Sequence, residues 1–375
     1  MRRVWSWLVP VVLVAGCGGD DADDGGATSE SAASSSAATT AAGEATVASS
    51  VDTTVPESVA PGTEAADDGP LTFAVMLPGT VDDHGWNLAM DQAAQDVAAE
   101  RGVEVSISSN TFDPTESEPV LRQFLDGGFD LIVVHGFNFE PVLVQLAPEH
   151  PEQLFTMATF SEPGANINIH TYSYLQTGYA MCWLGARLSE SGTVGMVGAA
   201  DVPFNSEEHA GCRLGAEAAV PGTTVIETYT NDFFDQQKAR EQAQSVVDQG
   251  ADVIFVSGGV DSSLGALAFC EDQDLVCMGV NTDQSDVAPN TVVSSAAIDW
   301  RPFLNDLLDQ VESGNFAPAV YDATFENGGL AVPAFDGPSG AKVPADVQEE
   351  FLQMIDDLAA GAAGLPDSGA HPGFP

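Results

Sequence analysis

Glycines, aromatic rings and polar side chains follow several apolar runs of the sequence at the point where each run ends. The residues concerned are Gly136, Phe137, Asn138, Phe233, Gly258, Gly259 and Asp283. Glycine lets a backbone approach a ligand closely, an aromatic ring offers a flat apolar face, and Asp283 can accept hydrogen bonds. This set suits the binding of a small polar molecule. Structural roles are the alternative, with the glycines in tight turns and Phe137 in the core.

Enzyme chemistry has little support in the sequence. Neither the nucleophile motif G-x-S-x-G nor the phosphate-binding motif G-x-x-x-x-G-K-[ST] occurs. The six histidines lack the H-x-x-x-H spacing of a zinc site. We therefore expect a protein that binds without turnover and needs no cofactor or metal; a surface hydrolase is the enzymatic alternative.

The charge balance argues against nucleic acid as a partner. The chain of 375 residues has 56 Asp plus Glu and 10 Lys plus Arg, which gives a formal charge of −46. Phosphate backbones are bound by clustered cations, which this composition does not supply. We interpret the acidity as a solvated surface suited to an external or salty milieu.

Apolar runs and helical patterns alternate after residue 70. Strands are expected at Leu71–Pro78, Val103–Ser108, Leu131–His135, Leu154–Phe160, Thr193–Val197, Thr224–Tyr229, Val253–Ser257 and Val276–Val280. Helices are expected at Trp86–Arg101, Glu118–Leu125, Glu140–Leu146 and near 176–189, 206–219, 236–249 and 262–271. Runs of Val, Ile and Leu without alternation indicate strands covered on both faces. The pattern predicts an α/β fold with doubly wound parallel sheets.

Two segments share one pattern and indicate two similar lobes. Gly128–Gly136 and Gly250–Gly258 each combine a helix-ending Gly, an Asp, an apolar strand and a closing Gly. Any two parallel strands resemble each other to some degree, which is the alternative. Open α/β sheets bind ligands at the carboxyl ends of their strands, so we expect the ligand in a crevice between the lobes.

The first residues have the features of an export signal. Arg2 and Arg3 precede a short apolar run that ends at Gly16-Cys17. Leu13–Cys17 resembles a bacterial lipobox, which implies cleavage before Cys17 and a diacylglycerol on its sulfur; an ordinary signal peptide with a stray cysteine is the alternative. Residues 18–69 lack Lys, Arg and aromatic residues, so we expect a disordered acidic tether between a cell-membrane anchor and an extracytoplasmic domain.

Four further cysteines can pair in an exported protein. Cys270 and Cys277 flank a polar turn that would bring a helix end beside a strand start, so we expect them to form a disulfide. Cys182 and Cys212 then pair by elimination. Four buried thiols are the alternative.

Several motifs together resemble the basic membrane protein family, the substrate-binding lipoproteins of ABC importers that are best known for binding nucleosides. The resemblance covers about residues 71–300. It rests on Asp83–Asn87, Tyr174–Tyr179, Val194–Gly198 with Asp201–Pro203, Gly250–Phe255 and Gly279–Gln284. The family has Phe where this chain has Trp86, and its later lysine falls near Ile298.

The resemblance implies a ligand site that includes Asp83, Trp86 and Asn87. Trp86 could stack on a base and Asp283 could accept hydrogen bonds from ribose hydroxyls. A second stacking aromatic of the family falls near Glu208, and Phe204 one turn earlier could replace it. Asp83 also fits a helix cap. Because the lysine and this ring are missing, another small polar ligand remains the alternative to a nucleoside.

We expect a monomer of two lobes joined by hinge strands, as in type I periplasmic binding proteins. Lobe 1 takes 70–173 and 284–318, lobe 2 takes 174–283 and 319–360, and 361–375 form a flexible tail. Hinges are expected near Tyr172–Tyr174, Val280–Asp283 and Ala319–Thr324, where closure would bury the ligand. The resemblance implies two partners, a small-molecule ligand and an ABC transporter permease. The alternative is a sensor of a non-nucleoside solute that signals to a membrane partner.

Overall fold

The computed structural model of the protein describes residues 70–365. The expected signal sequence, Cys17, the tether 18–69 and the tail beyond 365 lie outside the described residues. Between residues 70 and 365, no helix has the length and apolar character needed to cross a membrane.

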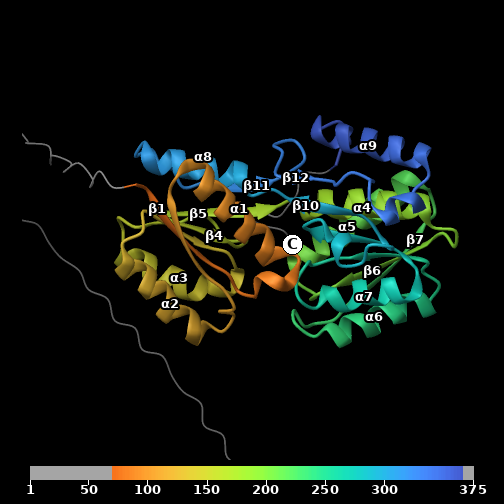
Figure 1. Cartoon of the computed structure of the whole chain (residues 1–375), viewed down its shortest axis with the longest axis horizontal. Coiled ribbons are helices and arrows are strands. Elements are labelled where there is room, and N and C mark those ends of the chain that lie inside the picture. Colours follow the sequence, from red (N-terminus) through yellow and green to blue (C-terminus); the bar gives the residue numbers. More distant parts are fainter. Residues whose placement is uncertain (1–69, 366–375) are drawn as a thin grey trace, which may run out of the picture. The chain divides into compact units, whose positions relative to one another are not determined.

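The first lobe is built on a parallel sheet. Its strands are β1 (Thr72–Met76), β2 (Glu104–Ser108), β3 (Leu131–Val134), β4 (Leu154–Ala158), β5 (Ile167–Tyr172) and β11 (Val320–Ala323), in the order β11-β5-β4-β3-β1-β2. Helices α1 (Trp86–Arg101) and α8 (Arg301–Glu312) lie on one side, and α2 (Pro114–Gly127) and α3 (Glu140–Leu146) on the other (Figure 1). Val75 and Val133 pack in the α1 core, whereas Met76 and Val134 pack toward α2 and α3. The uninterrupted apolar runs therefore reflect burial on both faces.

The second lobe repeats this arrangement. Its strands are β6 (Thr193–Gly198), β7 (Thr224–Tyr229), β8 (Val253–Val256), β9 (Val276–Asn281), β10 (Val292–Ile298) and β12 (Leu330–Ala331), in the order β12-β10-β9-β8-β6-β7, with β12 antiparallel. Helices α4 (Tyr174–Leu188) and α9 (Ala345–Ala359) cover one face, and α6 (Gln236–Asp248) and α7 (Ser263–Gln273) the other (Figure 1). Helix α5 (Pro203–Ala219) packs beside α4. The predicted α/β fold with two parallel-sheet lobes is confirmed.

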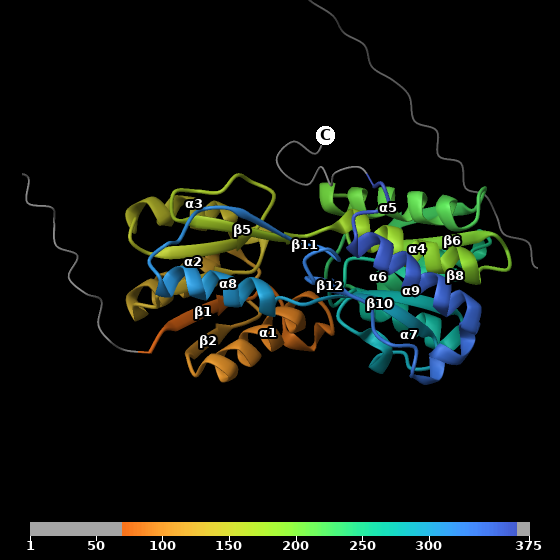
Figure 2. The same cartoon turned by 90° about the horizontal axis from the view of Figure 1, so that it is seen from above.

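The chain passes between the two sheets three times within residues 70–365, and these crossings correct the expected lobe boundaries. They follow β5, β10 and β11 (Figure 2). Strand β10 pairs with β9 in the second sheet, although 284–318 were assigned to lobe 1. Strand β11 pairs with β5 in the first sheet, although 319–360 were assigned to lobe 2. The expected hinge at Val280–Asp283 is therefore wrong, because the crossing comes one strand later.

Helices α4 and α5 pack unusually closely because glycines lie at their contact. A methyl group added at Gly178 would lie 1.9 Å from the carbonyl oxygen of Glu208, and one added at Gly211 would lie 2.1 Å from that of Leu175. A disulfide between Cys182 and Cys212 joins the same two helices. A second disulfide joins Cys270 to Cys277, so the structure has the pairing expected from the sequence.

Candidate functional site

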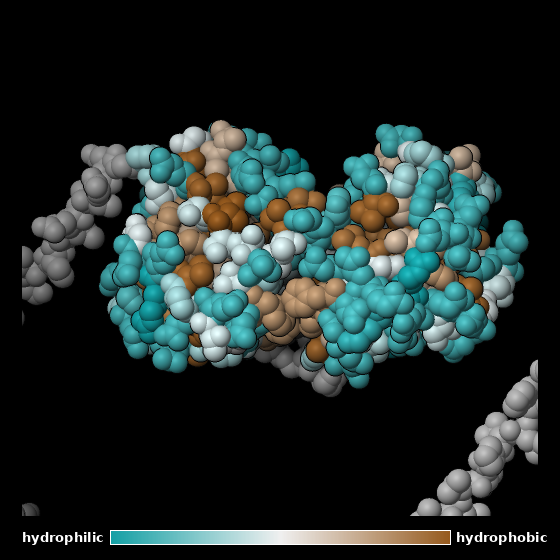
Figure 3. All heavy atoms as spheres, turned by 60° about the horizontal axis from the view of Figure 1, so that its bottom comes forward, coloured by the Kyte–Doolittle hydropathy of each residue, from teal (hydrophilic) through white to brown (hydrophobic). Residues whose placement is uncertain are grey.

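A cavity lies between the carboxyl ends of the two sheets. Its wall combines residues of both lobes and is rich in aromatic rings. The rings belong to Trp86, Phe112, Phe137, Phe160, Tyr172, Tyr174, Phe204, Phe233 and Phe234. On the face drawn in Figure 3, hydrophilic residues cover most of the surface and hydrophobic patches lie near the junction of the lobes. Aromatic faces around a cavity suit a flat ligand.

Rings from the two lobes touch each other at this cavity. Phe137 of the first lobe lies 6.0 Å from both Phe204 and Phe233 of the second, between ring centroids. Phe112 meets Phe234 edge-on at 5.1 Å, and both rings remain partly exposed. The two lobes therefore contact each other through aromatic rings at the cavity.

Trp86 is the first residue of α1 and is held from several sides. Its indole Nε1–H donates to the carbonyl oxygen of His135 at 3.1 Å, and its ring stacks on the His135 imidazole with centroids 3.9 Å apart. Its backbone N–H donates to the carbonyl oxygen of Gly259 in the other lobe at 2.8 Å. His135 therefore covers one face of the indole, and Trp86 also lines the cavity.

Behind Trp86 lies a buried chain of hydrogen bonds whose proton positions follow from its ends. His135 Nε2 lies 3.2 Å from the carbonyl oxygen of Trp86, which can only accept, so Nε2 carries the proton. His135 Nδ1 then accepts from Nε2 of His170 at 2.9 Å, and His170 Nδ1 accepts from the Thr156 hydroxyl at 2.8 Å. Burial lowers the pKa of His170 to about 3 and, together with His170, lowers the pKa of His135 well below its usual value. Both imidazoles are therefore neutral near pH 7.

Two asparagines of the cavity wall have acceptor oxygens without a partner. Asn138 Nδ2 donates to the carbonyl oxygen of Phe112, and Asn281 Nδ2 donates to that of Gly259. Because those partners can only accept, the amide orientations are fixed, and the buried Oδ1 atoms are left without a hydrogen bond. Asp261 adds a carboxylate to the same wall. Burial raises the pKa of Asp261, and the nearby Asp83 and Asp82 raise it further.

Most residues expected at the site do line this cavity. They are Trp86, Asn87, Gly136, Phe137, Asn138, Phe204, Phe233 and Gly258. Asn87 has an internal role as well, since it accepts from the Gly79 N–H at 3.0 Å and donates to Asp83 at 2.7 Å.

Three expected site residues lie elsewhere. Asp83 is fully buried and accepts hydrogen bonds from backbone N–H groups at the start of α1, which is the capping alternative. Gly259 contributes its carbonyl oxygen to Trp86 and Asn281 rather than lining the cavity. Asp283 is exposed and caps the short 3-10 helix Gln284–Asp286 by accepting from Ser285.

Sequence reasoning missed several residues of the wall. Asn281, Asp261, Phe112, Tyr172 and Tyr174 all line the cavity. A signal existed for Tyr174, which belongs to a motif of the resemblance, and for Asn281, which directly follows the expected strand Val276–Val280.

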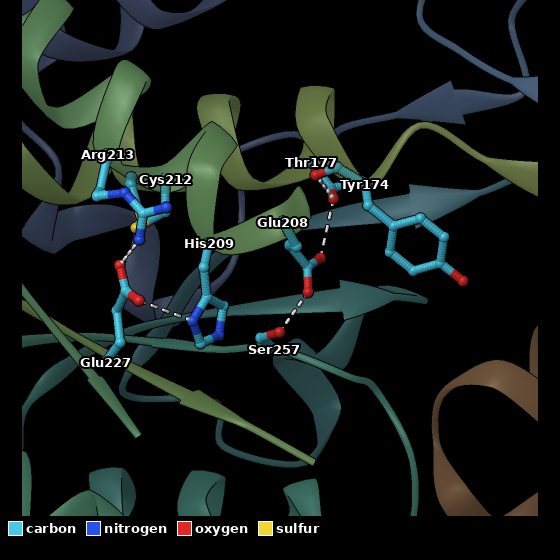
Figure 4. Close-up of a disulfide and its surroundings, with 9 residues drawn as sticks. Tyr174, Thr177, Glu208, His209, Cys212, Arg213, Glu227 and Ser257 are labelled. Carbon is cyan, nitrogen blue, oxygen red and sulfur yellow. Dashed lines mark hydrogen bonds and ion pairs between the residues drawn. A yellow bond between two sulfur atoms is a disulfide. The ribbon is translucent and has the colours of Figure 1, made fainter. Parts of the chain in front are cut away.

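Glu208, near which the second stacking aromatic of the family was expected, is a buried carboxylate. Glu208 on α5 accepts hydrogen bonds from Thr177 on α4 and from Ser257 after β8 (Figure 4). Burial raises the pKa of Glu208 to about 7 and that of its neighbour Glu207 to about 8. Glu208 is not among the residues that line the cavity, and its hydrogen bonds connect α5 to α4 and to the end of β8.

Two parallel-sheet lobes around one cavity at their strand ends match the architecture of ABC transporter solute-binding proteins. The family described as "ABC transporter substrate-binding protein PnrA-like" matches residues 71–325, and the chain belongs to it. Members of this family bind substrates for ABC transporters outside the cytoplasm and are not classed as enzymes. The resemblance to the basic membrane proteins is thereby confirmed.

Individual relatives differ in the ligands that their names state. A purine-binding protein of Brucella abortus is 25% identical over 248 residues, which cover 66% of this chain and 70% of that protein. A putative ABC transporter glucose-binding protein of Haloferax volcanii is 25% identical over 329 residues, or 83% of each chain. The structure of a solute-binding protein from Conexibacter woesei is 29% identical, with a TM-score of 0.65, and the match covers 79% of this chain and 99% of that one.

Proposed function

We propose that this protein binds a nucleoside in the cavity between its lobes and presents it to the permease of an ABC importer. The observation that carries the proposal is the aromatic wall, in which Trp86 is held at one face by His135 and borders the cavity. A purine base is flat and apolar on both faces, so it gains by stacking on such rings. The relative named as purine-binding supports the same ligand class.

The three acceptors of the wall suit the polar part of a nucleoside. Asn138, Asn281 and Asp261 can accept hydrogen bonds from ribose hydroxyls or amino groups. The site residues that we propose are therefore Trp86, Phe137, Asn138 and Phe204 together with Asn281 and Asp261.

The anchor of the protein forms part of the proposal. Cys17 would carry the lipid, and the tether 18–69 would let the binding domain reach a permease from the outer face of the membrane. Metabolic labelling with a radioactive fatty acid tests this anchor, and Cys17→Ala should abolish the labelling.

A thermal-shift screen of nucleosides, bases, sugars and amino acids tests the ligand class. Binding to the folded form alone raises the melting temperature, so nucleosides should raise it and Trp86→Ala should remove the effect. A shift with glucose and none with nucleosides would make this protein a sugar-binding member of the family, as the name of the Haloferax relative suggests for that protein.

A further inference from the structure

Two fully buried side-chain atoms of the described cavity wall lack a hydrogen bond, and both are acceptors. Asn138 Oδ1 comes from the first lobe and Asn281 Oδ1 from the second, and both are buried without a hydrogen bond. Burying an acceptor without a partner costs free energy, and a ligand that donates hydrogen bonds would recover it. The wall therefore favours a ligand with several N–H or O–H donors.

Asp261 is the one carboxylate among the described lining residues, and Lys and Arg are absent from that set. Asp261 belongs to the loop between β8 and α7. A methyl group added at Gly79 of the first lobe would come within 3.4 Å of Asp261 Oδ2. Its carboxylate forms no described ion pair, and its recorded hydrogen bond is with its own backbone N–H. Its neighbours Asp83 and Asp82 are themselves acidic. A carboxylate in this setting is stabilised most by a ligand that donates to it.

We propose that Asp261 is a specificity-determining residue that accepts hydrogen bonds from donor groups of the ligand. This inference rests on the proposed function and adds the chemistry that the site recognises. Two parts of a nucleoside could supply the donors, namely the exocyclic amino group of the base and the hydroxyl groups of ribose. A ligand that has acceptors only at this position leaves the carboxylate unpaired and is rejected.

Calorimetric titration of Asp261→Asn with adenosine, purine riboside and adenine tests the proposal. The asparagine keeps the shape of the side chain and replaces one acceptor oxygen by a donor. We expect adenosine affinity to fall by about 10- to 100-fold, as for the loss of a hydrogen bond to a charged group. Purine riboside lacks the amino group, so if it binds the wild type and Asp261→Asn equally well, the amino group is the donor to Asp261. Adenine lacks the ribose, so if it binds both proteins equally well, the ribose hydroxyls are the donors.

Asp283→Asn is the matched control, because Asp283 is exposed and lies outside the cavity. It removes the same charge and should change adenosine affinity less than twofold. Equal affinities of the wild type and Asp261→Asn for all three ligands would overturn this inference and leave the proposed function standing. If the wild type bound no nucleoside, the proposed function and this inference would both be wrong.

Discussion

Trp86 and His135 hold each other through two hydrogen bonds and a ring stack. The indole Nε1–H donates to the His135 carbonyl oxygen, the His135 Nε2–H donates to the Trp86 carbonyl oxygen, and the two rings are 9° from parallel. This mutual contact joins the start of α1 to the end of β3. It fixes the ring on which we expect the ligand to stack.

Thr156→Val should loosen this arrangement, although Thr156 itself does not line the cavity. Valine keeps the shape of threonine and removes the hydroxyl that donates to His170 Nδ1. One buried acceptor then lacks a partner, so the free energy of unfolding should fall by about 1–3 kcal/mol. The indole N–H resonance of Trp86, assigned with Trp86→Phe, should shift in ¹H–¹⁵N spectra.

Thr156→Ser restores the hydroxyl and serves as the control. It should return the Trp86 resonance to its wild-type position. An unmoved resonance in Thr156→Val would show that the histidine chain does not position Trp86.

Glu208→Gln should change the pH dependence of stability. Burial raises the pKa of folded Glu208 from 4.5 to about 7, so the folded form binds its proton more tightly than the unfolded form does. The resulting stabilisation is fully present below pH 4.5 and is lost as the pH rises toward 7. Glutamine cannot ionise. The free energy of unfolding of the variant, measured relative to the wild type, should therefore rise by on the order of 2 kcal/mol from pH 5 to pH 8.

Urea denaturation at the two pH values measures this difference. Glu349→Gln is the control, because Glu349 is an exposed residue of α9. Its free energy of unfolding should match that of the wild type at both pH values. A difference between Glu208→Gln and wild type that does not vary with pH would contradict the account of Glu208.

Gly211→Ala should destabilise the second lobe. The new methyl group would lie 2.1 Å from the Leu175 carbonyl oxygen, so α4 and α5 would have to separate. We expect a loss of about 3 kcal/mol, at the upper end of the usual cost of overpacking. Gly337→Ala is the control, because its new methyl group would lie no closer than 3.9 Å to another atom, Ser339 Oγ. Its free energy of unfolding should change by less than about 1 kcal/mol. Similar melting temperatures for the two variants would contradict the close packing.

Phe234→Ala should speed ligand release. Phe234 of the second lobe meets Phe112 of the first lobe edge-on at the cavity. Removing the ring removes this contact between the lobes, so koff should rise about 3- to 10-fold with a smaller change in kon, as expected when a contact of about 1 kcal/mol is lost. Stopped-flow fluorescence measures both rates. Leu352→Ala removes an equally exposed apolar side chain from α9, and its koff should match that of the wild type.

Most helices and strands could be predicted from the sequence, but the side chains that face the cavity could not all be identified from it. Helix α1 was predicted with its observed bounds, because apolar residues recur with helical period between Trp86 and Gly102. Strand β10 was assigned to the wrong lobe, since its apolar run carries no information about which sheet it joins. Only the crossing after β10 determines this.

Asp283 was expected at the site from the sequence, whereas Asn281 lines the cavity. Strand β9 ends at Asn281, where a positive φ of 74° turns the chain. Asn281 therefore stays at the cavity while Asp283 reaches solvent and caps the next turn. Asp83 was ambiguous for a related reason, because a carboxylate before a helix can cap it or bind a ligand, and here the N–H groups of α1 occupy it.

Titration of the purified protein with adenosine in a calorimeter tests the central claim most directly. The account predicts heat from one site per chain, with a negative heat-capacity change from burial of the base among the rings, and no such heat with Trp86→Ala. Saturable heat with glucose and none with adenosine would contradict it.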